Sequence, residues 1–446
     1  MAAGGVHQLA QCITCHAWNA DMSMVAICPN NSEVHIYKAS ASPEAVWERV
    51  YVLEKHEQLV TGIDWAPKSN RIVTCSHDRN SYVWSLEDGE WQPTLVILRL
   101  NRAATSVEWG PQENKFAVGS SAKTVCVCYY EEDNNWWVSK LIRKKHHSTI
   151  TSVSWHPNNV LLATTSTDSK CRIFSAFIKG VDARKDGTTA FGDVKFGEEL
   201  IQLDLACGWA FGVHWSPSGN SLAYVGHDST IHFVTDVGPT PSARSISLRH
   251  LPLRDILFLS ETRLVAGGFD CNPMLFASDK TGVWEFIAFL DEVKPPAEAK
   301  SDTLFAAAKG KFKWLGSELS EENAPTTTHE NCITMIRSLV PFSERNSEKS
   351  IEVFSTSGLD GRIVIWDLNN SNKGWSKQWI PPVEEAKKVL ERLKSCIKPE
   401  AVEEAVEKLK SSVLPQAEEA KKTLVRLKSS VIEYVEQVPQ SSELHD

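Results

Sequence analysis

The sequence lacks any long hydrophobic run. No apolar stretch in its 446 residues approaches the roughly 20 that a bilayer-spanning helix needs. The N-terminus, "MAAGGVHQLAQ", has neither the basic start nor the apolar centre of a secretory signal. Positive charge is not in excess either: the net charge is −9, which does not favour binding to nucleic acid or anionic lipid. We therefore expect a protein of the cytoplasm without a membrane span.

Catalytic and cofactor motifs are also missing. No Gly-rich phosphate loop, paired-carboxylate motif or Ser–His–Asp set stands outside the repeats described below. The 11 cysteines are odd in number and irregularly spaced, which is typical of reduced thiols rather than of a disulfide framework. We expect a protein that is not an enzyme and carries no cofactor.

One short motif nevertheless resembles a haem or zinc site. Residues 11–18, "QCITCHAW", contain C-x-x-C-H. The repeat described next makes this segment an inner strand, on which Cys12 and Cys15 would point to opposite faces and could not share a metal. Two His–Asp pairs also resemble metal ligands: His77–Asp78 and His227–Asp228. Both pairs fall in a recurrent turn where Asp has a structural role, so we expect no metal site.

Tryptophan is abundant, with 16 copies, and it anchors an internal repeat. Each unit has a short apolar run that ends at the anchor, a turn, and a second apolar run. Five anchors are Trp18, Trp65, Trp109, Trp155 and Trp215. Two weaker units follow, one with Phe258 at the anchor and one that begins "CIT" at Cys332. Spacings of about 45 residues are typical of WD repeats.

Each unit carries the signals of four short strands. After the second apolar run comes a tight turn with Asn or Asp, followed six residues later by the end of a third strand. The turn residues are Asn31, Asp78, Asp168, Asp228, Asp270 and Asp360, and the third unit has Ala122 instead. Four antiparallel strands per unit predict an all-β fold, a seven-bladed WD-repeat β-propeller over residues 1–370.

A buried hydrogen-bond network is expected in these repeats. His56 precedes its anchor by nine residues, the position of the loop His in WD repeats. It forms a set with Asp78, which fixes the turn, and Trp84, whose indole N–H needs a partner. The remaining expected members of the structural network are Asp168, Asp228, Asp270, Asp360 and Trp366.

The ring needs a closing strand. The seventh unit lacks its own fourth strand, because "NNSNKGWSKQWIPP" after Asp367 has the composition of a loop. Residues 5–11 stand where an outer strand precedes the next inner strand. We expect them to complete the seventh blade, since an open blade would fray.

A long insertion, residues 291–330, separates the sixth and seventh units. Within it, "SDTLFAAAKGKFKWL" begins with a natural helix N-cap, Ser301 or Asp302. One face of the predicted helix carries Leu304, Phe305, Ala308, Phe312 and Leu315. Long loops with their own amphipathic helix are usually functional. The face either binds a partner, which we favour, or folds back on the propeller.

The C-terminal region differs from the repeats. Residues 371–382 form a predicted linker, residues 383–438 a helical extension, and residues 439–446 a disordered terminus. The extension contains three diverged copies of one amphipathic helix, broken at Pro399 and Pro415. Its apolar stripes could pack together, dock on a partner or lie on a membrane. Near-balanced charge argues against the membrane, and the first two alternatives stay open.

The strongest basic cluster is "RKKHH". Its Arg143, Lys144 and Lys145 form either a solvated loop between blades or a docking patch for an acidic partner.

Long segments resemble one known family. "VTGIDWAPKSNRIVTCSHDRNSYVW", "SWHPNNVLLATTSTDSKCRIF" and "STSGLDGRIVIWDL" are similar to the WD-repeat subunit 1 of the actin-related protein 2/3 complex. The resemblance covers residues 1 to about 368 in order, and the extension from Val383 departs from it.

The resemblance implies a non-catalytic structural subunit of the assembly that nucleates branched actin filaments, in the cytoplasm and cytoskeleton. It implies that the propeller holds other subunits. It also implies that the protruding helix, here Thr303 to Phe312, contacts the actin filament or nucleation-promoting factors. The alternative is a stand-alone WD-repeat adaptor or a substrate receptor of another complex.

Overall fold

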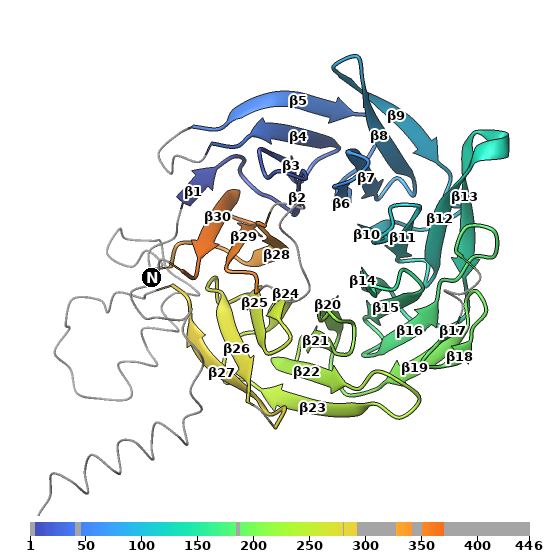
Figure 1. Ribbon diagram of the computed structural model, residues 1–446. Coiled ribbons are helices and arrows are strands. Elements are labelled where there is room, and N and C mark those ends of the chain that lie inside the picture. The colour runs from blue at the N-terminus through green and yellow to red at the C-terminus, as the bar shows by residue number, and fades with distance from the viewer. Residues whose placement is uncertain are drawn as a thin grey trace, which may run out of the picture. The chain divides into compact units, whose positions relative to one another are not determined.

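Seven four-stranded antiparallel sheets form a ring of blades in this computed structural model (Figure 1). The structure describes residues 5–40, 46–183, 188–279, 281–291, 327–340 and 350–369. The predicted seven-bladed β-propeller is confirmed. No helix in this described part of the chain is both long and apolar enough to cross a membrane.

Blades 1 to 4 follow the chain from the inside of the ring outward. Blade 1 has β2 (Cys15–Trp18), β3 (Met24–Cys28), β4 (Glu33–Lys38) and β5 (Glu48–Glu54). Blade 2 has β6 (Val60–Ala66), β7 (Arg71–Ser76), β8 (Ser81–Glu87) and β9 (Glu90–Val96). Blade 3 has β10 (Ala104–Trp109), β11 (Lys115–Ser120), β12 (Val125–Glu131), the 3₁₀ helix η1 (Glu132–Asn134) and β13 (Trp136–Ile142). Blade 4 has β14 (Ile150–Trp155), β15 (Leu161–Ser166), β16 (Cys171–Ser175) and β19 (Glu199–Leu203).

Blades 5 to 7 complete the ring. Blade 5 has β20 (Ala210–Trp215), β21 (Leu222–Gly226), β22 (Thr230–Thr235) and β23 (Ser242–Ser247). Blade 6 has β24 (Leu253–Ser260), β25 (Arg263–Gly268), β26 (Met274–Ser278) and β27 (Trp284–Phe289). Blade 7 has β28 (Ile333–Ser338), β29 (Val353–Gly358), β30 (Arg362–Asp367) and β1 (Gly5–Gln8). The innermost strands face the centre of the ring (Figure 1) and line a central cavity, which we call the channel.

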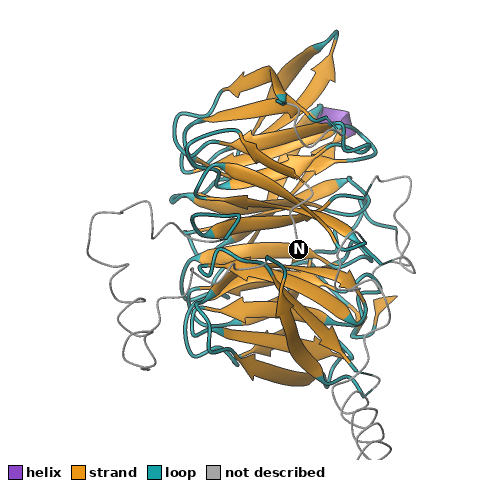
Figure 2. Cartoon of the chain, turned by 90° about the vertical axis from the view of Figure 1, so that its left-hand side faces the viewer, coloured by secondary structure: helices purple, strands orange, loops and turns teal. Residues whose placement is uncertain are grey.

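Blades pack on one another through the anchor residues. Trp109, which is buried, contacts Phe116 and Trp137 edge-on at ring distances of 5.2 and 5.7 Å within a core shared with blade 2. Second strands such as β11 and β15 are buried along their whole length because both sheet faces meet a neighbouring blade. In the side view the strands run between the two faces of the ring (Figure 2).

The two faces carry different loops. In each antiparallel blade the turn between second and third strands lies on the same side as the connection to the next blade. We call this side the turn face. A backbone bond ties the two loops together, as from His77 N–H to Leu59 C=O at 2.9 Å and from His227 N–H to Trp209 C=O at 2.8 Å.

The N-terminus closes the ring, as predicted. β1 pairs antiparallel with β30, with Gly5 opposite Ile365 and Gln8 opposite Arg362. The adjoining turn needs glycine at Gly361, whose φ is +76° and whose added Cβ would lie 1.9 Å from the Ala10 carbonyl oxygen. This close approach allows Leu9 N–H to bond the Gly361 carbonyl at 3.0 Å.

Two details differ from the sequence interpretation. The first inner strand begins at Cys15, so Cys12 precedes it. The expectation that both cysteines lie on one strand is therefore wrong. The connection between β16 and β19 of blade 4 holds a short hairpin of β17 (Thr188–Thr189) and β18 (Gly192–Asp193), which was not predicted from the sequence. It is fastened by an ion pair in which the fully buried Lys115 lies 2.5 Å from Asp182.

Two predicted regions lie outside the described residues. The insertion helix with its five face residues, Leu304, Phe305, Ala308, Phe312 and Leu315, is one. The C-terminal extension is the other. Both stay predictions, as do the domain limits proposed from the sequence.

Candidate protein-interaction site

Buried side-chain networks position the loops of the turn face. In blade 2, His56 Nδ1 lies 2.7 Å from Asp78 and its Nε2 lies 2.8 Å from the Thr74 hydroxyl. Trp84 Nε1 donates to the same hydroxyl at 3.0 Å. Asp78 also accepts from Glu57 N–H and Asn80 N–H at 3.1 and 2.9 Å. The network therefore links the inter-blade loop, the turn and two strands.

Blade 7 repeats this arrangement. His329 lies 2.9 Å from Asp360 and 2.7 Å from Thr356, and Trp366 donates to Thr356 at 2.8 Å. The sequence interpretation named Asp360 and Trp366 but missed both threonines and His329. Thr74 and Thr356 each stand ten residues before the network Trp, a spacing that could have identified them.

The turn Asp has other partners in blades 4, 5 and 6. In blade 4, Asp168 accepts from the buried Arg172 at 2.9 Å and from His147 N–H at 2.8 Å. Burial alone would raise the pKa of Asp168, but these bonds, with His146 and the Arg172 charge, hold it well below its usual value. Asp228 and Asp270 instead accept from the loop N–H groups of Cys207 and Leu251, at 2.7 and 2.8 Å.

Five threonines, which the sequence interpretation missed, join the inner strands of blades 1 to 4 and 7 to the following blade. Each donates to a backbone carbonyl of the following blade. The bonds run from Thr14 to Val60 (3.4 Å), Thr61 to Ala104 (2.9 Å), Thr105 to Ile150 (2.6 Å), Thr151 to Ala210 (2.6 Å) and Thr334 to Ile13 (3.1 Å). A Thr near the start of the inner run in blades 1 to 4 and 7 was the available signal.

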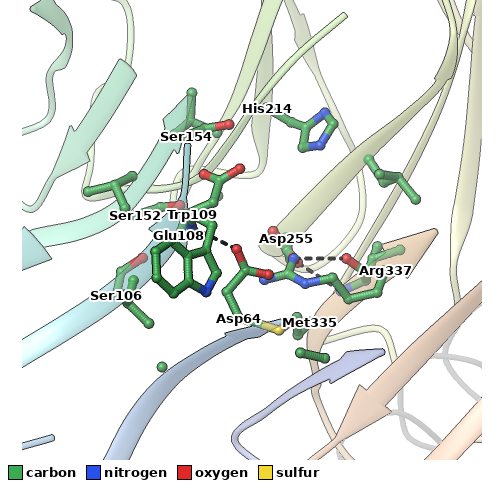
Figure 3. Close-up of a pocket in the computed structure, with 18 of the residues that line it drawn as sticks. Asp64, Ser106, Glu108, Trp109, Ser152, Ser154, His214, Asp255, Met335 and Arg337 are labelled. Carbon is green, nitrogen blue, oxygen red and sulfur yellow. Dashed lines mark hydrogen bonds and ion pairs between the residues drawn. The ribbon is translucent and has the colours of Figure 1, made fainter. Parts of the chain in front are cut away.

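Carboxylates bridge blades further along the channel. Asp64 accepts from Trp109 N–H at 2.7 Å, Glu108 from Trp155 N–H at 3.2 Å, and Asp255 from Ile336 N–H at 2.8 Å. Figure 3 shows the three around one space together with Arg337. Arg337 lies 4.0 Å from Asp255.

The channel shifts the pKa values of these groups. Burial, with the negative charge of Asp64, raises the pKa of Glu108 to about 8. Burial also raises the pKa of Asp255, although Arg337 works against the shift. For His214, burial and the Arg337 charge lower the pKa to about 4.

The channel cavity has a volume of about 450 Å³ and is lined mainly by the inner strands. Within the ranges that the structure describes, no three His, Cys, Asp or Glu side chains come together as metal ligands. Each channel carboxylate already accepts a backbone N–H of the next blade. The carboxyl groups that line this cavity therefore hold neighbouring blades together.

The turn face over blades 3 and 4 is basic. Arg143, Lys144 and Lys145 are all exposed in the loop that joins the two blades. Lys145 lies 3.8 Å from Glu199. The exposed Arg102 and Lys123 belong to neighbouring loops of blade 3, whose turn has Ala122 where blades 2 and 4 to 7 have Asp. Sequence reasoning found the three consecutive residues but missed these two.

The turn face over blades 5 to 7 is apolar. Trp209, Leu251, Phe269 and Leu359 are 55, 49, 39 and 37 % exposed. The Trp209, His227 and Phe269 rings adjoin, with centroid distances of 5.7 and 6.2 Å. A rigid platform that shows one basic and one apolar region suits protein recognition.

Comparison with known proteins supports the fold assignment. A family described as "WD domain, G-beta repeat" matches residues 47–85 and 139–175, which lie in blades 1–2 and 3–4. An Arabidopsis thaliana protein, actin-related protein 2/3 complex subunit 1A, is 59 % identical over 384 residues, which cover 85 % of this chain and 100 % of that protein. The chain belongs to the subunit 1 family of the actin-related protein 2/3 complex.

More distant relatives agree with this family. Subunit 1A-B from Xenopus laevis is 46 % identical over 369 residues, covering 81 % of this chain and 96 % of the relative. Subunit 1 from Schizosaccharomyces pombe is 38 % identical over 372 residues, covering 79 % and 96 %. The resemblance drawn from the sequence is confirmed.

Proposed function

We propose that this chain is a non-catalytic structural subunit of the actin-related protein 2/3 complex, which supports nucleation of branched actin filaments in the cytoplasm and cytoskeleton. The observation that carries the proposal is 59 % identity over the whole length of a relative that bears this subunit name. The propeller, stiffened by its inter-blade bonds, would hold other subunits of the complex.

Co-purification tests the membership. A tagged full-length chain in native extract should elute far above its own mass of 49.7 kDa, together with the actin-related subunits. A stand-alone adaptor would elute near the monomer mass, and the substrate receptor of another complex would elute with different proteins. Either result would contradict membership of this complex.

The insertion is proposed to contact the actin filament or a nucleation-promoting factor. Phe305 and Phe312 are seven residues apart, so they share one face of the predicted helix. Burying each against a partner would contribute roughly 2–3 kcal/mol before association costs.

A double substitution tests this contact. Phe305→Ala with Phe312→Ala should leave assembly and the melting temperature unchanged while it weakens filament branching. Branching by purified complexes is the measurement, with Lys309→Ala as a control in the same segment. Normal branching together with a lower melting temperature would contradict partner docking.

The basic loop is proposed as a docking patch for an acidic segment of a partner. Arg143, Lys144 and Lys145 concentrate positive charge on a chain whose net charge is −9. Oppositely charged segments would be steered there over about one Debye length.

A further inference from the structure

The apolar part of the turn face combines a wall of exposed rings with a recess. We define the blade 5–7 surface by Trp209, His227, Leu251, Phe269 and Leu359. Between blades 5, 6 and 7 it holds a cavity of about 360 Å³, lined by His227, Leu251, Phe269 and Cys332 among others. Contiguous apolar surface of this kind is costly to leave in water and marks a binding site.

Both ends of the insertion are fastened beside this surface. Asp291 N–H donates to Asn272 Oδ1 at 2.9 Å, and Asn272 Nδ2 donates to the Asp291 carbonyl at 3.2 Å. The returning chain is held by a bond from Thr328 N–H to the Asp291 carboxylate. Asn272 belongs to the same turn as Phe269. The insertion therefore leaves and rejoins the propeller at the edge of the blade 5–7 surface.

The chain between these points is long enough to lie across it. Residues 292–300 and 316–326 flank the predicted helix and can each extend about 30 Å. A segment tethered so closely has an effective concentration of about 1 mM toward the surface. Even a weak apolar contact is populated at that concentration, whereas a free partner at cellular concentration must bind much more tightly to compete.

We propose that the blade 5–7 surface is the seat of the chain's own insertion helix, residues 301–315, when no partner is bound. The helix would place Phe305 and Phe312 against the rings of Trp209 and Phe269. This inference rests on the proposed function, because the same face is assigned to the partner. When a partner binds, the apolar face of the helix would leave the blade 5–7 surface and contact the partner instead.

Hydrogen exchange of the isolated full-length subunit tests the seat. Exchange in a peptide covering residues 301–315 should be slowed about tenfold by docking, and Trp209→Ser with Phe269→Ser should remove that protection. The matched control is Ile97→Ser with Trp136→Ser, which removes side chains that are 59 and 58 % exposed, one directly after β9 of blade 2 and the other at the start of β13 of blade 3. The control should keep the protection, and both variants should melt at the temperature of the wild-type chain.

Equal exchange of residues 301–315 in all three proteins would overturn the inference. Protection of residues 301–315 that survives Phe305→Ala with Phe312→Ala would also overturn it, since the contact would then not depend on these two rings. If residues 301–315 are unprotected but Phe305→Ala with Phe312→Ala still weakens branching, the seat is wrong and the partner contact stands. If protection of residues 301–315 depends on Trp209 and Phe269 but Phe305→Ala with Phe312→Ala leaves branching normal, the partner contact is wrong and the seat stands.

Discussion

At the scale of single residues, the Thr74 hydroxyl forms hydrogen bonds with two buried rings. Asp78 accepts from His56 Nδ1, which leaves Nε2 of the same ring to accept from the Thr74 hydroxyl. The hydroxyl oxygen in turn accepts from Trp84 Nε1. One side chain therefore satisfies a donor and an acceptor that water cannot reach.

We expect Thr74→Val to destabilise the propeller by about 2 kcal/mol or more, because both rings lose their partner. Thr94→Val, on the exposed outer strand β9, is the matched control and should change stability by less than about 0.5 kcal/mol. Thermal unfolding of the two variants is the measurement. Equal melting temperatures would contradict the role given to the hydroxyl.

Glu108 predicts a pH dependence of stability. Its pKa is about 8 in the folded protein, against an ordinary value of 4.5. Between these values the unfolded chain releases the proton while the folded chain keeps it, so stability falls as pH rises through this window. Below the window Glu108 is protonated in both states and contributes nothing to the difference.

Glu108→Gln should remove this penalty while it keeps an acceptor for Trp155 N–H. We expect the variant to gain about 1–2 kcal/mol at pH 8, allowing for screening by solvent in the channel, and little at pH 5. Glu54→Gln, on the exposed side of β5, should gain at neither pH. A gain that is equal at pH 5 and pH 8 would show that charge at Glu108 is not the cause.

Site residues that recur at a fixed position in each repeat could be predicted from the sequence. Residues whose role depends on contacts between blades could not. His56, Asp78 and Trp84 recur at fixed distances from an anchor, so their positions follow from spacing. Asp64, Glu108 and Asp255 act between blades, and their partner is a backbone N–H of the next repeat, which no side-chain pattern records. The threonines of the inner strands do recur at one position of the repeat, but their carbonyl partners in the next blade are not recorded in the sequence.

At the scale of elements, the closure of blade 7 depends on one turn. Gly361 carries a positive φ, and the Ala10 carbonyl fills the space where a side chain would begin. Gly89, in the turn between β8 and β9, has a φ of +85° but no atom within 4 Å of an added Cβ. Substituting Ala at each glycine therefore distinguishes the cost of backbone strain, which both positions share, from the cost of disturbing ring closure, which arises at Gly361 alone.

We expect Gly361→Ala to lower the melting temperature clearly more than Gly89→Ala. Both pay roughly 1 kcal/mol for a left-handed backbone, but only Gly361→Ala pushes β1 away from β30 and opens the ring. Differential scanning calorimetry of both variants is the measurement. Equal losses would mean that closure tolerates displacement of residues 9 and 10.

Element boundaries were the less predictable part of the fold. The repeat set the number of blades, and the missing outer strand of blade 7 pointed to the N-terminus. It also placed Cys12 on the first inner strand, whereas the structure starts that strand at Cys15. Ile13 N–H instead bonds the Gly358 carbonyl of blade 7, so the preceding residues serve closure rather than blade 1.

At the scale of the propeller, the turn face is divided. Basic residues gather over blades 3 and 4, and apolar residues gather over blades 5 to 7. The division follows from repeat variation: blade 3 has no turn acid, while the turns of blades 6 and 7 place Phe269 and Leu359 before theirs. The same scaffold thereby offers two kinds of contact from one side.

The basic half gives the last prediction. Arg143→Glu with Lys144→Glu should weaken binding of an acidic peptide from a nucleation-promoting factor by about tenfold or more at low salt. Lys145 is left in place because Glu199 lies 3.8 Å from it. The melting temperature should not change, since both substituted residues are exposed and surface charges contribute little to stability.

The control must carry the same change of charge elsewhere. Arg49→Glu with Arg244→Glu reverses two exposed charges on β5 and β23, the outer strands of blades 1 and 5, away from the basic loop. Titrations of the peptide at increasing ionic strength should converge for the wild-type chain and the loop variant, because salt screens the attraction that only the wild-type loop provides. If both double reversals weaken binding equally at every salt concentration, net charge rather than the loop governs the interaction, and the docking patch is wrong.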